Sequence, residues 1–310
     1  WLEGVHGFDG RPALQVADEP AKLGHLSASE TWITANKIPV GDTATTFVEY
    51  TKKHARGLFD GIAAVLTGST NIVARILHGV PAPVLILLIA GLSWVLRRSV
   101  GLAVFVVLSL LFIMNQGYWD ATLETLTLVL VAAMVATVIG VPLGIWGAKR
   151  PRVYAAMRPV LDLMQTLPTF VYLTPTLVLF GLGIVPGLIS TIIFALPAPI
   201  RLTELGIASV PKTLREAGQA FGATPLQLLF KVELPSARPM ILAGITQCIM
   251  LSLSMVVIAA LVGAGGLGVP VVRALNTVQV GMGFEAGMAI VLLAIMLDRI
   301  SRPPEKKGQE

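Results

Sequence analysis

The stretch ATLETLTLVLVAAMVATVIGVPLGIWG, residues 121–147, decides the fold class. Its one charged residue is Glu124, and as a helix it is longer than the roughly 30 Å hydrocarbon core of a bilayer. Six other runs are apolar enough to be spans, at about 82–97, 99–115, 160–181, 187–205, 238–262 and 281–298. The sequence therefore predicts an all-α integral membrane protein with about seven transmembrane helices.

The composition excludes the main soluble classes. Of 310 residues, 55% are hydrophobic and 13% are charged, against roughly a quarter charged in a soluble domain. The net charge of +5 comes from basic residues between apolar runs, so a nucleic-acid-binding face is not indicated. Cys248 is the only cysteine, and the four histidines all precede residue 79, so we expect no metal site.

Basic residues predict the topology because Lys and Arg concentrate in cytoplasmic loops. Four clusters fall on alternate loops: Arg97 and Arg98; Lys149, Arg150, Arg152 and Arg158; Lys212, Arg215, Lys231 and Arg238; and Arg299, Arg302, Lys306 and Lys307. We therefore expect an extracytoplasmic N-terminus and a cytoplasmic C-terminus. The predicted parts are a tail at 1–80 with an interfacial amphipathic helix at about 57–78, a membrane domain at 81–300 and a tail at 301–310.

The predicted cytoplasmic loop at 209–235 is too charged to cross a bilayer and reads as two short amphipathic helices. Pro211 suits a first helical turn, and Gly222 suits a left-handed helix end. Thr224 and Gln227 have the spacing of a capping box, and Pro235 ends the pattern. Such a pair either docks into a groove of a soluble partner or caps its own membrane domain, and physical reasoning leaves both open.

The same loop resembles the EAA signature of ABC importer permeases. Glu216, Ala217, then Gly222, then Leu234 and Pro235 match its spacing, with Val232 also in place and Gly218 where alanine is usual. In that family the loop is the coupling helix that inserts into a cleft of each ATPase subunit. The resemblance implies these ATPase-coupling residues: Glu216, Ala217, Gly218, Gly222, Leu226, Leu234 and Pro235.

Further segments resemble the permeases of glycine betaine, proline and choline importers, over about residues 60–300. These are LDLMQTLPTFVYLTP (161–175), IIFALPAPIRLTELGI (192–207) and LSLSMVVIAALVGAGGLG (251–268). The resemblance implies a type I ABC importer permease of the bacterial inner membrane. It would form a homodimer, work with two cytoplasmic ATPase subunits and an extracytoplasmic solute-binding protein, and move glycine betaine, choline or proline betaine by alternating access.

The predicted span at 160–181 is the most polar and contains two prolines, which suggests that it lines the pathway. Phe170 and Tyr172 could present ring faces to a quaternary ammonium group, because aromatic faces attract cations. Packing explains single aromatic residues as well. The candidate lining residues are Gln165, Thr166, Thr169, Phe170 and Tyr172.

Glycines at 263, 265 and 268 spell G-x-G-x-x-G, the pattern of a dinucleotide site. We reject that interpretation because the preceding apolar run is far longer than a strand. We expect Gly263, Gly265, Gly266 and Gly268 to allow tight turns or close helix approach in a gate region. No G-x-x-x-x-G-K-[ST] loop occurs, so ATP and Mg²⁺ are expected on the partner ATPases and no catalytic residue or cofactor on this chain.

Three rival functions remain. A secondary transporter would need carboxylates at mid-membrane, but the acidic residues considered lie near predicted span ends, where we expect Arg201 to pair with Glu204. A scaffold that only recruits a soluble partner predicts that Gln165 and Thr169 tolerate leucine. A permease for another small solute, such as methionine or another amino acid, is the third.

Overall fold

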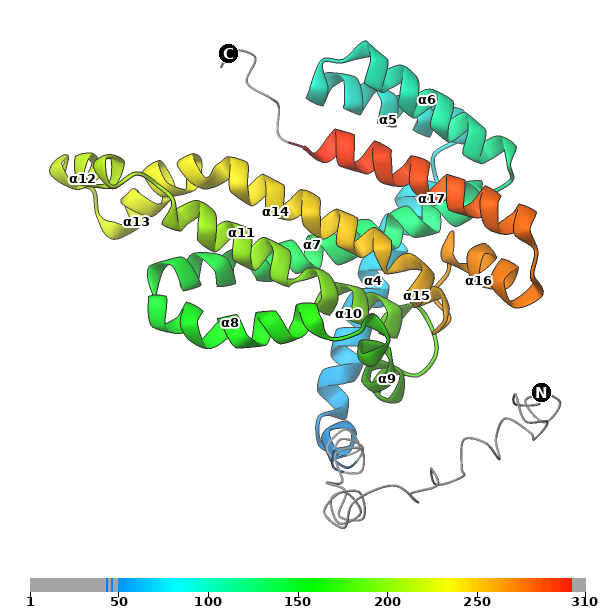
Figure 1. The fold of residues 1–310 in the computed structure, drawn as a ribbon, viewed down its shortest axis with the longest axis horizontal. Coiled ribbons are helices and arrows are strands. Elements are labelled where there is room, and N and C mark those ends of the chain that lie inside the picture. Colours follow the sequence, from blue (N-terminus) through cyan, green and yellow to red (C-terminus); the bar gives the residue numbers. More distant parts are fainter. Residues whose placement is uncertain (1–42, 44–45, 47–49, 303–310) are drawn as a thin grey trace, which may run out of the picture. The chain divides into compact units, whose positions relative to one another are not determined.

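A computed structural model describes residues 43, 46 and 50–302. The helices labelled in Figure 1 belong to the second of the chain's two units, Lys52–Glu310, and every regular element described there is helical. They are α4 (Arg56–His78), α5 (Ala82–Arg97), α6 (Val100–Asn115), α7 (Trp119–Lys149), α8 (Pro151–Thr166), α9 (Thr169–Phe180), α10 (Ile184–Ala195), α11 (Pro197–Ala208), α12 (Lys212–Ala220), α13 (Pro225–Leu228), the π-helix η2 (Leu229–Glu233), α14 (Leu234–Ser254), α15 (Val256–Ala260), α16 (Gly268–Thr277) and α17 (Val280–Ser301).

The all-α membrane prediction agrees with this arrangement, but the number of spans differs from seven. Five helical segments are long and apolar enough to cross a membrane: Arg56–His78, Trp119–Lys149, Ile184–Ala208, Pro225–Ala260 and Val280–Ser301. A sixth is the bent pair of α8 and α9. Helices α5 and α6 have 16 residues each, about 24 Å of helix, which is short of the hydrocarbon thickness.

The span predicted at 160–181 is wrong as a single helix, because the chain bends by 97° between α8 and α9. Leu167 is extended (φ −65°, ψ 134°), as expected for a residue before proline, and Pro168 begins the new direction. The Tyr172 hydroxyl donates to the carbonyl of Met164 across the break. The bend therefore places α9 across the direction of α8.

Helix α11 lies between α7 and α14, and glycines make this packing close. A Cβ on Gly144 of α7 would lie 2.6 Å from the carbonyl oxygen of Ile200 and 2.7 Å from Cβ of Thr203. On the other side, a Cβ on Gly206 of α11 would lie 2.8 Å from Cβ of Met240. Small residues allow membrane helices to approach closely. The signal for this contact is the G-x-x-x-G spacing of Gly140 and Gly144.

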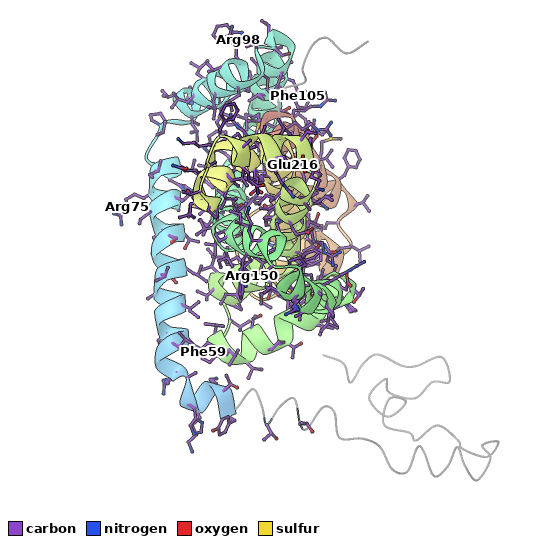
Figure 2. All side chains as sticks on the ribbon, turned by 90° about the vertical axis from the view of Figure 1, so that its left-hand side faces the viewer. Phe59, Arg75, Arg98, Phe105, Arg150 and Glu216 are labelled. Carbon is purple, nitrogen blue, oxygen red and sulfur yellow. The ribbon has the colours of Figure 1, made fainter. Side chains whose placement is uncertain are left out.

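Helix α4 runs across the direction of α7 and α14 instead of alongside them, as Figures 1 and 2 show. It buries Leu66 and Thr70 and exposes half of its apolar residues. Its length and hydropathy also meet the criterion for a span, so the interfacial location predicted for 57–78 stays a prediction. Most of the tail predicted at 1–80, and residues 303–310 of the C-terminal tail, lie outside the described residues.

Two of the basic clusters meet in space. Arg97, which ends α5, donates 2.9 Å to the carbonyl of Arg302, just after α17. Thr246, midway along α14, donates 3.0 Å to the carbonyl of Ser301. The first half of α14 therefore extends beyond the end of α17, and it leads to α13 and α12 at the far left of Figure 1.

Candidate functional site: the loop between α11 and α14

The two short helices expected at 209–235 are present as α12 and α13, and η2 continues α13 into α14. The capping box is confirmed: the Thr224 hydroxyl accepts from the Gln227 amide at 3.3 Å, and the Gln227 side chain accepts from the Thr224 amide at 2.9 Å. Between the helices, Gly222 has φ +74°, a conformation that glycine adopts without strain. The loop is therefore built by the local signals that the sequence carries.

The loop presents an unusual amount of apolar surface. Phe221 is 92% exposed, and Leu214, Leu226 and Phe230 are also exposed. Helix α12 buries none of its residues. Glu216 and Ala217 are exposed too, and the Glu216 carboxylate lies 3.8 Å from the Lys212 ammonium one turn earlier. Figure 2 looks at the end of the bundle that carries Glu216.

Two further predicted coupling residues, Gly218 and Leu234, face the protein. A Cβ on Gly218 would lie 2.7 Å from a Leu228 methyl group and 3.4 Å from one of Val232, so an alanine here would require Leu228 to shift. Leu234 packs beside the buried cluster of Ile207, Leu229 and Ala237. Pro235 is exposed in the first turn of α14, directly after the π-helical turn η2.

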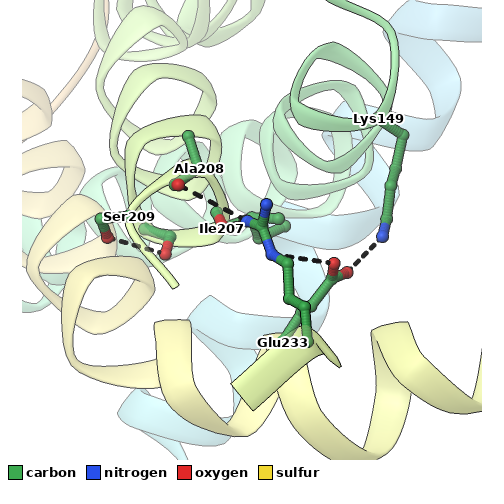
Figure 3. A network of polar contacts seen from close by, with 7 residues as sticks. Lys149, Ile207, Ala208, Ser209 and Glu233 are labelled. Carbon is green, nitrogen blue, oxygen red and sulfur yellow. Dashed lines mark hydrogen bonds and ion pairs between the residues drawn. The ribbon is translucent and has the colours of Figure 1, made fainter. Parts of the chain in front are cut away.

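A buried carboxylate connects this loop to two spans (Figure 3). Glu233 is 3% exposed and forms ion pairs with Lys149, the last residue of α7, and with Arg215 of α12 (Nε to Oε1, 3.4 Å). Arg215 Nη2 also donates to the carbonyls of Ile207 and, at 3.4 Å, Ala208 at the end of α11. Sequence reasoning missed Glu233, because no local pattern indicates partners 84 and 18 residues away.

The predicted Arg201–Glu204 pair is wrong. Arg201 instead forms an ion pair with Asp162 of α8, with 2.5 Å between Nη2 and Oδ1. Glu204 instead lies beside Tyr154, which is also on α8. Arg201 and Glu204 thus both face α8 instead of each other, and the Arg201–Asp162 ion pair links α8 to α11.

The candidate pathway residues do not all share one environment. Gln165 and Thr166 end α8 and are exposed, Thr169 begins α9 half-buried, and Phe170 is 58% exposed. Tyr172 is 8% exposed, and its hydroxyl donates a hydrogen bond to the carbonyl of Met164. The structure thus leaves Phe170 as the candidate aromatic residue whose ring face is open in this chain.

The glycine segment after α15 lies against the beginning of α7. The Glu124 carboxylate accepts from the Gly266 amide at 2.7 Å, and the Thr125 hydroxyl accepts from the Leu267 amide at 2.8 Å. The Val262 carbonyl accepts from the Gly183 amide at 2.8 Å. Glu124 therefore holds a turn in place.

Each glycine of this segment stands where a larger residue would be strained or would collide with a neighbour. Gly263 and Gly266 have φ of +92° and +99°. A Cβ on Gly265 would collide with the Glu124 carboxylate, and one on Gly268 with the Val256 carbonyl. Tight turns and close approach, as predicted for these glycines, are both present; their part in a gate stays a prediction. Among residues 50–302 and the two described positions before them, no three His, Cys, Asp or Glu side chains group as a metal site.

Comparisons with known proteins agree with this architecture. Residues 140–302 match the family described as "Binding-protein-dependent transport system inner membrane component". The chain is 47% identical over 266 residues to the glycine betaine transport system permease protein OpuAB of Bacillus subtilis, covering 86% of this chain and 94% of that one. It is 46% identical over 265 residues to the glycine betaine/proline betaine permease protein ProW of Escherichia coli, covering 86% and 75%.

A solved structure extends the match to three dimensions. A chain of the MetNI methionine ABC transporter, in an inward-facing conformation, superposes with a TM-score of 0.52 at 25% identity and covers 56% of this chain and 88% of that one. The matched family spans the helices that carry the loop, the buried ion pairs and the glycine segment. The chain therefore belongs to the family of inner membrane components of binding-protein-dependent transport systems.

Proposed function

We propose that this chain is the permease subunit of an ABC importer that carries a quaternary ammonium osmoprotectant: glycine betaine, choline or proline betaine. The observation that carries the proposal is the loop of α12 and α13, whose apolar residues are exposed on a chain of this family. The solute class rests on the relatives, whose names include glycine betaine, proline betaine and carnitine.

In this proposal two copies of the chain enclose the pathway, and partner proteins supply energy and solute. Cytoplasmic ATPase subunits bind ATP and Mg²⁺ and receive α12, while an extracytoplasmic binding protein delivers the solute. The loop 209–235 and residues 301–310 face the cytoplasm, and residues 1–80 face outward, as the basic clusters indicate. Labelling of single introduced cysteines by a membrane-impermeant thiol reagent tests this topology.

Disrupting the loop should uncouple ATP hydrolysis from the solute. Glu216→Lys reverses a charge on the exposed face of α12, and Gly222→Pro cannot adopt φ +74°. We expect either change to reduce solute-stimulated ATP hydrolysis by about 5- to 150-fold, the range of ordinary coupling free energies. The measurement uses liposomes that contain the permease with its ATPase and binding protein, titrated with betaine and choline.

A matched control distinguishes a requirement for the left-handed turn from a requirement for glycine itself. Gly222→Asn should keep most of the stimulation, because asparagine tolerates the left-handed conformation. Equal amounts of assembled complex must be recovered for all variants. Full stimulation in both Glu216→Lys and Gly222→Pro would contradict the assignment of the loop as the coupling site.

Phe170 should contribute to recognition of the cation during passage. A ring face attracts a quaternary ammonium group by about 0.5–2 kcal/mol, so Phe170→Leu should weaken apparent solute affinity by about 2- to 30-fold. Phe170→Tyr keeps a ring face and should retain the affinity. The measurement is the solute concentration at half-maximal uptake. Equal values for the leucine and tyrosine variants would show that Phe170 does not contact the solute in the pathway.

A permease for methionine is the second candidate, because the superposed solved structure is a methionine transporter. Including methionine in the same ATP hydrolysis titration distinguishes the two. Stimulation of ATP hydrolysis by methionine and not by any quaternary amine would indicate that the transported solute is an amino acid.

A further inference from the structure

Helix α12 has few means of moving the membrane helices other than its polar contacts. None of its residues is buried, and its main helix neighbours are α13 and η2, which belong to the same loop. Arg215 is the α12 side chain that reaches past the loop, to the carbonyls of Ile207 and Ala208 at the end of α11. The same guanidinium contacts Glu233.

Glu233 extends this connection to a second span. Its Oε2 pairs with Lys149, which ends α7, while its Oε1 faces Arg215. A carboxylate in such a buried position is stable only while it is paired. The three side chains therefore hold the ends of α7, α11 and α12 together around one negative charge, as Figure 3 shows.

The backbone around Glu233 is adapted to this position. Residues Leu229–Glu233 form a π-helical turn between α13 and α14. Such a turn holds one residue more than an α-helical turn and rotates the residues after it by about 100°. An uninterrupted α-helix would thus direct position 233 elsewhere, and π-turns frequently occur at functional positions.

There is room beside the cluster for movement. Arg215 also lines a cavity of about 510 Å³ with Gly147, Tyr154, Arg158 and Glu204. This space lets the paired cluster move together with α12 as one unit, while its ion pairs stay formed.

We propose that Glu233 is a positioning residue of the coupling apparatus: it locks Arg215 and Lys149 together so that a displacement of α12 reaches α7 and α11 at once. This inference rests on the proposed function, because it requires an ATPase that moves α12. It adds a residue outside the EAA positions, and its action goes through Arg215 and Lys149 instead of through the partner.

The test measures solute molecules transported per ATP hydrolysed by the complete complex in liposomes. Glu233→Gln keeps the shape and removes the charge, so we expect assembled complex with this ratio reduced at least about fivefold. Glu233→Asp and Lys149→Arg keep the charges and should stay within about twofold of the wild-type ratio, on the same coupling scale. A double variant, Lys149→Met with Glu233→Gln, should be no worse than Glu233→Gln alone.

A purely structural role predicts a different result. Yield and thermal midpoint would fall, and transport and ATP hydrolysis would fall in proportion, so an unchanged ratio overturns the proposal. If Glu233→Gln does not assemble, the same ratio of solute transported to ATP hydrolysed is measured for Lys149→Met. This variant should assemble, because Lys149 is partly exposed and its loss leaves Arg215 beside Glu233. Absence of stimulated turnover in the wild-type complex would contradict the proposed function; a normal wild type with an unchanged variant ratio would contradict only the role of Glu233.

Discussion

Replacing Gly144 by leucine should strongly reduce the recovery and the thermal midpoint of the folded permease. The new Cβ would lie 2.6 Å from the Ile200 carbonyl oxygen and 2.7 Å from Cβ of Thr203, and the rest of the side chain has no space on that face. Because one of these atoms is backbone, α11 must move away from α7 as a whole. Overpacking of well-packed sites typically costs about 1–3 kcal/mol and sometimes more, a large fraction of a stability of about 5–15 kcal/mol.

The measurement is the fraction of detergent-solubilised protein that elutes as a single species, with its thermal midpoint. Gly91→Leu is the matched control, because a Cβ on Gly91 in α5 meets no atom within 4 Å. We expect this control to behave as wild type. Normal yield and midpoint for Gly144→Leu would mean that α7 and α11 do not pack as described.

Gly266→Ala should be a strongly destabilising single-methyl change in the glycine segment. Alanine would have to adopt φ +99° and place its Cβ 2.6 Å from the Thr125 hydroxyl oxygen. The strained backbone costs about 1–2 kcal/mol and the contact about 1–3 kcal/mol, so we expect a total loss of about 2–5 kcal/mol. The substitution also disturbs the amide that donates to Glu124.

Thermal unfolding of the purified permease measures the stability, and uptake in the reconstituted complex measures the functional loss. Gly287→Ala in α17 is the control, since its Cβ meets no atom within 4 Å and alanine favours helix. A gate role predicts that uptake by Gly266→Ala falls even at temperatures where the variant is fully folded. Wild-type uptake in that range would leave these glycines a structural role alone.

Helix α7 connects the two regions that these experiments address. Its first turns carry Glu124 and Thr125, which hold the glycine segment, and its last residue is Lys149, which pairs with Glu233. The 31 residues of α7 span about 46 Å. Helices α14 and α15 run between the same regions, from Leu234 to Ala260. A displacement at the loop can thus reach the glycine segment through rigid helices, as alternating access requires.

Local sequence signals determined much of this protein. Apolar length gave the membrane class and most of the helices, since a helix in hydrocarbon satisfies its own backbone hydrogen bonds. The Thr224 capping box and the Gly222 turn act over a few residues, so they could be read without the fold. The spacing around Glu216 and Gly222 identified the family, which the match over residues 140–302 confirms.

The tertiary structure decided what depends on residues far apart in the chain. The sequence indicated a proline interruption near Pro168, but the 97° bend is visible only in the fold, where α9 packs mainly against α10. Arg201 had a plausible partner three residues away and found Asp162, 39 residues away, because α8 lies alongside it. No sequence pattern singled out Glu233, yet it is buried against Lys149, 84 residues away. The direction and burial of these side chains follow from helix packing. The residue pattern along one helix does not reveal which helix packs beside it.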